Sequence, residues 1–179
     1  MNIRREVVGS LLRPPYLKEA RSQHASGNLT AAEFKAIEDR AVDEAIALQE
    51  SAGIDVITDG EMRRYAFFGH LAESLEGFDL EGGWAIPFVD ETGEQILYKR
   101  PVVVERLRWK RSMCSEEWVY LRSRASRPGK VTMLSAQQAA AYYEPTKSAT
   151  AYPSRDAYLA DIVDFSRREI AELARLGCT

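Results

Sequence analysis

The chain is poor in the residues that build cross-linked, metal-bound or membrane-spanning proteins. It has only two cysteines, Cys114 and Cys178, and two histidines in 179 residues. Two cysteines so far apart imply no disulfide framework, and these few cysteines and histidines lack the close spacing of a structural zinc site. No apolar run approaches the roughly 20 residues that cross a bilayer. We therefore expect a cytoplasmic protein without a signal peptide or a membrane partner.

An excess of charge of either sign is also missing. The formal net charge is -3, and 28% of the residues are charged. This acidic balance argues against a dedicated nucleic-acid-binding protein. Basic residues between positions 106 and 130 are interleaved with glutamates, so we interpret them as a solvated helix face. The hydrophobic fraction of 45% is enough for a real core, and we interpret residues 1–179 as a single domain.

The first third of the chain alternates between strand and helix patterns. Residues 7–10 form a short apolar run, which predicts a first strand, and two prolines then open a helical turn. Thr30 and Glu33 have the spacing of a capping box, so they predict the start of a helix that Gly53 ends. Residues 54–58 predict a second strand. A strand, a helix and a strand in this order are typical of a parallel crossover unit.

The pattern changes after position 77. We expect a β-hairpin insertion near residues 77–100, with strands at 86–89 and 95–98 and a turn at 91–94. A third strand from 102 to about 107, a helix from 115 to 125 and a fourth strand at 130–134 follow. The last helix should begin after Ser154, bury an apolar face that includes Ile162, Ile170 and Leu173, and end at Gly177.

Four strand–helix units cannot close an eight-stranded barrel, which typically takes about 250 residues. An open half-barrel would expose a strand edge and part of its hydrophobic interior. We therefore expect either a fragment of a longer protein or a chain that pairs with a second copy or with a partner half.

The sequence Asp59-Gly60-Glu61 follows directly on the predicted second strand. In barrels of alternating strands and helices, the carboxyl ends of the strands hold substrate groups. The two carboxylates could therefore hold an amine or position a proton. The alternative is that Asp59 caps the next helix and Glu61 pairs with Arg63 or Arg64 on the surface. We favour the functional interpretation because of the position at a strand end.

Other candidate residues carry weaker signals. Gly9 and Ser10 could let a ligand approach the backbone and a hydroxyl group, or they could simply lead out of a strand. Arg13 could bind an anion through its guanidinium fork or lie in solvent. We interpret His70, in an aromatic loop, as a partly buried packing residue, and Cys178 as a small core residue.

Three segments, 8–14, 57–64 and 130–132, closely resemble the cobalamin-independent methionine synthase family, and especially its short, single-barrel members. The resemblance implies a (β/α)8 TIM barrel, of which this chain would be the amino-terminal half. It also implies methyl transfer from a donor such as a methyltetrahydrofolate to a thiol such as homocysteine. In that family a zinc ion binds the acceptor as a thiolate, the form that is nucleophilic.

By position, the resemblance implies that Gly9 and Ser10 contact the amino-acid acceptor and that Glu61 holds its ammonium group. Asp59 and Arg63 would support the loop or pair with Glu61. The family's zinc ligands would lie beyond the last residue of this chain, so we assign neither catalytic residues nor metal ligands here and expect no activity from the chain alone. Two alternatives stay open: another acceptor, such as a coenzyme thiol, or a non-catalytic half-barrel that binds a partner chain.

Overall fold

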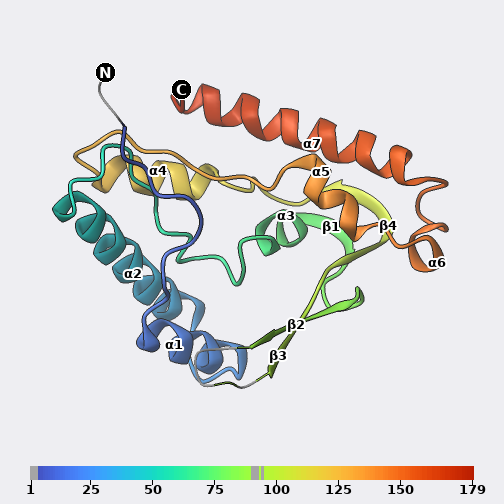
Figure 1. Cartoon of the computed structure of the whole chain (residues 1–179), viewed down its shortest axis with the longest axis horizontal. Helices are drawn as coiled ribbons and strands as arrows, with labels where there is room; N and C mark the ends of the chain where they lie inside the picture. The colour runs from blue at the N-terminus through green and yellow to red at the C-terminus, as the bar shows by residue number, and fades with distance from the viewer. Residues whose placement is uncertain (1–3, 90–92, 94) are drawn as a thin grey trace. The chain divides into compact units, whose positions relative to one another are not determined.

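The computed structural model describes residues 4–89, 93 and 95–179 (Figure 1). The chain divides into two compact units. The first unit consists of Met1–Phe67, Cys114–Thr132 and Leu176–Thr179, and the second consists of Phe68–Met113 and Met133–Arg175. Each unit therefore combines segments that are far apart in the sequence.

The helices of the first unit are α1 (Pro15–Ala25), α2 (Ala31–Ser51) and α4 (Ser115–Arg124). The predicted capping box at the start of α2 is confirmed. The backbone N–H of Glu33 donates to Thr30 Oγ1 at 3.3 Å, and the N–H of Thr30 donates to the Glu33 carboxylate at 2.9 Å. Gly53 follows the helix with a φ of +74°, which confirms the predicted stop.

Near the strands predicted in the first unit, the structure has single parallel bridges, Glu6 with Val56 and Ile57 with Gly129. The prediction of a fourth strand at 130–134 was wrong, because the bridge falls at Gly129 and residues 130–134 form no strand. The N–H of Ile57 donates to Pro128 O at 3.0 Å, and the N–H of Lys130 donates to Ile57 O at 2.9 Å. The predicted second strand thus lies between the other two segments. The first pairing falls at Glu6 rather than within residues 7–10, and the chain has left the pairing by Val8, whose side chain is 93% exposed.

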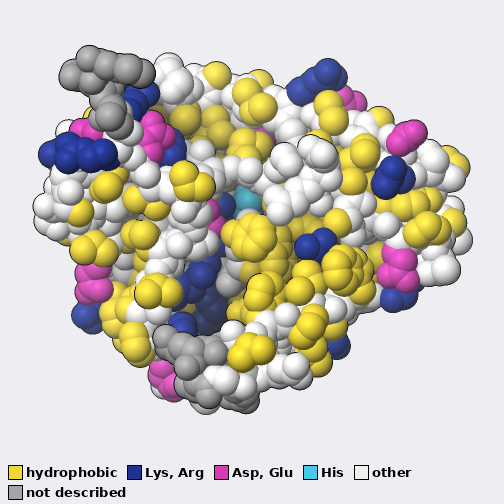
Figure 2. Space-filling view, viewed as in Figure 1, with side chains coloured by type: hydrophobic (Ala, Val, Ile, Leu, Met, Phe, Trp, Pro, Cys, Tyr) yellow, Lys and Arg dark blue, Asp and Glu magenta, His cyan; other side chains and the backbone are white. Residues whose placement is uncertain are grey.

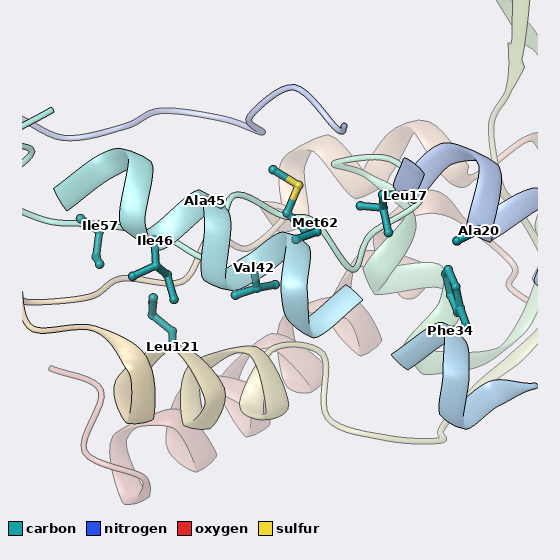
Figure 3. Packing of buried hydrophobic residues seen from close by; sticks show 10 residues of the cluster. Leu17, Ala20, Phe34, Val42, Ala45, Ile46, Ile57, Met62 and Leu121 are labelled. Carbon is teal, nitrogen blue, oxygen red and sulfur yellow. The ribbon is translucent and has the colours of Figure 1, made fainter. Parts of the chain in front are cut away.

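The core of the first unit lies between its helices and the segment that follows the second predicted strand (Figure 3). Each large apolar side chain buried there stabilises the fold by roughly 1.5–3 kcal/mol. Ile57 and Met62 belong to this cluster, so the intervening turn is held at both ends by buried side chains. The buried members are Leu17, Ala20, Phe34, Ala41, Val42, Ala45, Ile46, Ile57, Met62 and Leu121.

The second unit contains two separate antiparallel pairs of strands. Strand β1 (Leu75–Asp79) pairs with β4 (Val102–Trp109), and β2 (Ala85–Val89) pairs with β3 (Gln95–Lys99). The β2–β3 pair confirms the predicted hairpin, while most of its predicted turn at 91–94 lies outside the described residues. The helices are α3 (Gly69–Ser74), α5 (Ala136–Ala139), the 3-10 turn η1 (Ala140–Tyr142), α6 (Pro145–Ser148) and α7 (Arg155–Arg175).

The predicted third strand at 102–107 is confirmed, but it does not have the parallel pairing of a barrel strand. This segment is β4, and its partner β1 runs antiparallel to it. Val102 and Val103 are buried, as the apolar run predicted. A run of this kind indicates a buried strand but does not identify its partner. In the part of the chain that the structure describes, no closed barrel is formed, and the fold is mixed α/β.

Helix α7 begins as predicted, with the N–H of Ala157 donating to Ser154 Oγ at 3.1 Å. Its predicted apolar face is only partly buried. Ile162 is fully buried, but Ile170 is 58% exposed, and Glu169 is buried beside it. The Glu169 carboxylate accepts from Ser112 Oγ at 2.7 Å and 2.8 Å, which accounts for a charged side chain in this position. Among the described residues, no helix is long and apolar enough to cross a membrane.

Candidate functional site

The Asp59-Gly60-Glu61 segment of the first unit is a tight turn with unusual backbone angles. Gly60 has a φ of +71° and Glu61 a φ of +57°. The left-handed region is uncommon for residues other than glycine, and such positions cost of order 1–3 kcal/mol unless their surroundings hold them. The N–H of Glu61 donates to Asp59 Oδ1 at 2.9 Å, which closes the turn.

The turn is fixed to helix α2 by the buried side chain of Gln49. The Gln49 amide nitrogen donates to Thr58 O at 2.8 Å, and its oxygen accepts from the N–H of Thr58 at 2.9 Å. On the other side, the N–H of Leu11 donates to Gly60 O at 3.1 Å. The 10–13 segment and the turn are thereby brought together.

The carboxylate of Glu61 is the centre of the site. Its side chain is almost fully buried, yet both of its oxygens accept hydrogen bonds. Ser10 Oγ donates to Oε2 at 2.7 Å, and Thr132 Oγ1 donates to Oε1 at 2.9 Å. The structure therefore brings Ser10 and Glu61 together, as the sequence analysis placed them, and adds Thr132.

Arg64 supplies the cation of the site. Its Nε and Nη2 donate to the two carboxylate oxygens of Glu117 at 2.9 Å and 2.5 Å. Nη1 donates to Thr132 Oγ1 at 3.0 Å, and Nη2 also donates to Thr132 O at 2.8 Å. The distance from Nη1 to Glu61 Oε2 is longer, at 3.6 Å. The Arg64 fork is thus engaged mainly by Glu117 and Thr132, away from Glu61.

The buried pair has shifted acid–base properties. Burial raises the pKa of Glu117 to about 7, although the hydrogen bonds and charge of Arg64 act in the opposite direction. Burial disfavours the charge on Arg64, but the carboxylate of Glu117 outweighs it and raises the pKa of the guanidinium group. Arg64 therefore stays protonated at every physiological pH.

Asp59 has a buried carboxyl group whose two oxygen atoms differ in their hydrogen bonding. Burial raises its pKa, against the hydrogen bond that it accepts from the N–H of Glu61. Its Oδ2 atom has no hydrogen-bond partner among the described residues. A carboxyl group in these surroundings favours its protonated form more than an exposed aspartate does.

The remaining candidate residues, Gly9 and Arg13, have different surroundings in the structure. Gly9 has a φ of +83°, and no atom lies within 4 Å of the position that a Cβ would take, so the space beside Ser10 is open. Arg13 clamps the turn, because its Nε donates to Arg64 O at 3.0 Å and its Nη2 to Glu61 O at 3.1 Å. Neither of the two roles considered for Arg13, an anion site or a solvent position, describes this contact.

Arg63 points to a different part of the first unit. Its guanidinium group forms an ion pair with Asp39 at 2.6 Å and lies 4.5 Å from the centre of the Tyr120 ring. The residue that approaches Glu61 is its neighbour Arg64, which the sequence analysis considered only as a surface partner.

Sequence reasoning missed the functional context of Glu117 and Thr132. Glu117 was interpreted as part of a helix start, although it lies four residues before the buried Leu121, a spacing that places both on one helix face. That spacing could have revealed it. Thr132 lies in the middle of the strand predicted at 130–134, and no pattern in the sequence distinguishes it from its neighbours.

A zinc site is not built from the side chains present. In residues 4–89, 93 and 95–179, no group of three or more histidine, cysteine, aspartate or glutamate side chains could hold a metal ion. Cys114 is fully buried and its thiol donates to Thr132 O at 3.6 Å. His70 is buried in α3 of the second unit, which agrees with a packing role. The side chains that the structure describes therefore do not fit the zinc ion of the family.

A mixed α/β fold with a carboxylate held at the end of a buried strand is typical of α/β enzymes that bind small molecules at strand ends. Residues 5–179 match the family described as the catalytic domain of cobalamin-independent synthase. The chain belongs to this family, which confirms the resemblance seen in the sequence.

Curated relatives and solved structures agree with this assignment. The chain is 32% identical over 120 residues to a methionine synthase of Sulfurisphaera tokodaii, an alignment that covers 65% of this chain and 33% of the relative. It is 28% identical over 166 residues to a 5-methyltetrahydropteroyltriglutamate–homocysteine methyltransferase of Thermodesulfovibrio yellowstonii, covering 92% of this chain and 19% of the relative.

The structure of a B12-independent methionine synthase from Shewanella sp. W3-18-1, in complex with selenomethionine, has the same fold over 97% of this chain. The TM-score is 0.72 at 21% sequence identity, and the match covers 49% of that protein. A putative vitamin-B12-independent methionine synthase from Listeria monocytogenes gives a TM-score of 0.69 at 21% identity, covering 99% of this chain and 51% of that one. The chain thus spans between about a fifth and a half of the length of these proteins.

Proposed function

We propose that this chain forms the acceptor-binding part of a methyltransferase that moves a methyl group from a methyltetrahydrofolate-type donor to the thiol of homocysteine. The observation that carries the proposal is the Glu61 carboxylate, which is buried at a strand end and oriented by hydroxyl groups from two distant segments. In this proposal Glu61 binds the ammonium group of the amino acid. Gly9 and Ser10 line the approach to it.

The chemistry of the Glu61 carboxylate supports this assignment. An ionised carboxylate has about four lone-pair positions, so the two hydroxyl donors leave room for further donors. Hydrogen bonds between an ammonium group and a carboxylate are shorter and roughly twice as strong as neutral ones. Ser10 is exposed, and the space at Gly9 is open, so an acceptor has a route to the carboxylate.

The proposal limits what the chain does to binding and orientation. Its residues would hold the amino group of the acceptor, but the described side chains do not form a group that could hold the metal that the family uses. We therefore propose that the chain is inactive by itself and that its activity depends on residues outside it.

We also propose that the parallel segments around Glu6, Ile57 and Gly129 are the beginning of a (β/α)8 barrel that other residues complete. Apolar side chains on the surface support this proposal. Val8 is 93% exposed and Leu12 is 96% exposed, and Figure 2 shows that hydrophobic side chains reach the surface in that view. Size-exclusion chromatography tests it, because an incomplete barrel should associate with itself or with an added carboxyl-terminal half. A stable, well-folded monomer that does not bind the added carboxyl-terminal half would refute the proposal.

The acceptor assignment is tested by binding two ligands to the full chain at pH 8. L-homocysteine and 4-mercaptobutyrate have the same thiol and carboxylate, but only homocysteine has the ammonium group. We expect the chain to prefer homocysteine by at least about tenfold, and Glu61→Gln to abolish this preference. Glu116→Gln is the matched control, since it removes an exposed carboxylate from the same unit. An unchanged preference in Glu61→Gln would favour another class of acceptor, such as a coenzyme thiol.

A further inference from the structure

Glu61 forms a long ion pair with Arg64 rather than a hydrogen-bonded one. Arg64 Nη1 is 3.6 Å from Glu61 Oε2, which is beyond a good hydrogen bond. The same guanidinium group contacts Glu117 at 2.9 Å and 2.5 Å. A bidentate pair of this kind is geometrically specific, so Arg64 is held on the Glu117 side.

Thr132 occupies the position between Arg64 and Glu61. A guanidinium group has only donors, so Arg64 Nη1 must use a lone pair of Thr132 Oγ1, at 3.0 Å. The single hydroxyl proton of Thr132 is then directed to Glu61 Oε1, at 2.9 Å. The hydroxyl group therefore orients the carboxylate and engages one of the two N–H donors of Arg64 Nη1.

The charged side chains of the site carry one more negative charge than positive charge. The positive charge of Arg64 is balanced by Glu117, its bidentate partner. The Asp59 side chain contributes little negative charge when its buried carboxyl is protonated, and its Oδ1 accepts from the N–H of Glu61. The carboxylate of Glu61 thus accepts hydrogen bonds from two neutral hydroxyl groups, and its ion pair with Arg64 is long, at 3.6 Å. A cationic group of a bound ligand would therefore stabilise this almost fully buried carboxylate.

We propose that Glu117 and Thr132 are positioning residues that hold Arg64 away from Glu61 and so reserve the carboxylate of Glu61 for the ammonium group of the acceptor. The inference rests on the proposed function, and it assigns the preference for an amino-acid thiol over a plain thiol to this network. In a variant that lacks the Glu117 carboxylate, we expect Arg64 to bind the carboxylate of Glu61 instead. Without the hydroxyl of Thr132, Arg64 Nη1 gains access to Glu61, and the carboxylate loses a donor.

The test uses the full chain with Thr132→Val, Thr132→Ser and Glu117→Gln. Dissociation constants for L-homocysteine and 4-mercaptobutyrate are measured by calorimetry at pH 8, under reducing conditions. The ratio of the two constants is compared within each variant, so a partly unfolded sample changes both values but leaves the ratio intact. Thr132→Ser keeps the hydroxyl group and serves as the rescue variant, and Glu116→Gln is the control for Glu117→Gln.

The expected result is a preference of at least about tenfold in the unaltered chain, in Thr132→Ser and in Glu116→Gln. In Thr132→Val and Glu117→Gln it should fall below about threefold. A merely structural role would weaken both ligands together and leave the ratio unchanged, which would overturn the inference. If Glu61→Gln removes the preference while Thr132→Val and Glu117→Gln keep it, the inference fails and the proposed function stands. If Glu61→Gln keeps it, or the unaltered chain has no preference, both fail.

Discussion

Replacing Arg64 by methionine should destabilise the chain more than any exposed charge substitution. The change removes five hydrogen bonds, two to Glu117, two to Thr132 and a long one to Cys114 Sγ, from a side chain that is 2% exposed. It leaves the Glu117 carboxyl buried without a cation. Removing one partner of a buried ion pair typically costs about 3–5 kcal/mol. This is a large part of the roughly 5–15 kcal/mol by which domains are stable.

A double substitution separates the two parts of this cost. Arg64→Met with Glu117→Met replaces the pair by apolar side chains of similar length, and such replacements are often neutral or stabilising. We therefore expect the double variant to be at least about 2 kcal/mol more stable than Arg64→Met alone. Arg167→Met is the control. Its ion pair with Asp164 is exposed, with side chains 75% and 73% accessible, so its loss should cost less than about 1 kcal/mol.

The measurement is urea unfolding at pH 8 followed by circular dichroism, with the slope of each transition compared among the variants. A cost below about 1 kcal/mol for Arg64→Met would refute the reasoning, because it would mean that the buried pair contributes no more than a surface pair. A double variant as unstable as the sum of the single ones would refute it too.

Three further predictions follow from single residues. Because burial raises the pKa of Glu117 to about 7 from an ordinary 4.5, the folded chain holds this proton more tightly than the unfolded one. The free energy of unfolding should therefore fall as the pH rises from about 4.5 to about 7, and urea midpoints should show less of this fall in Glu117→Gln; an equal fall in both would contradict the shift. Gly60→Ala should cost about 1–2 kcal/mol or more in urea unfolding, because the backbone is left-handed there and the new Cβ would lie 3.1 Å from Ala45 Cβ; a loss under about 0.5 kcal/mol would be inconsistent with that backbone. A thiol reagent should modify the partly exposed Cys178 in the native chain and the fully buried Cys114 only after unfolding, and rapid reaction of both would show that the Cys114 region opens.

The sequence predicted local structure well where a short-range interaction defines it. The capping hydroxyls of Thr30 and Ser154 each bond the N–H three residues later, and both helix starts were confirmed. The hairpin strands were also placed correctly, since alternating apolar residues and a turn signal are local. Strand pairing was less predictable. The 102–107 segment was recognised as a strand, but its antiparallel partner β1 depends on distant parts of the chain.

In the candidate site, too, local features could be predicted from the sequence and long-range contacts could not. The turn at Gly60 and the carboxylate of Glu61 were visible as a motif at a strand end. The partners of Glu61 were not, because Thr132 is 71 residues away in the sequence and carries no pattern of its own. Arg64 was recognised as a possible partner of Glu61 but was expected on the surface. The spacing of Glu117 from Leu121 indicates a buried position for Glu117 on its helix, but it does not identify Arg64 as its partner. The role of Glu61 in binding an acceptor stays a prediction.

The network around Glu61 also has a kinetic consequence. Its hydrogen bonds join residues that are 51, 53, 68 and 71 positions apart. Closing such long loops is entropically expensive, so contacts of this kind form late and lower the folding rate. Helices α1 and α2 are neighbours in the sequence and pack against each other, so this pair should form before the site does. Nascent chains would therefore form helices well before Glu61 is positioned to bind a ligand. In the native chain, amide hydrogens of the 59–64 turn should exchange with solvent faster than those in the interior of α2.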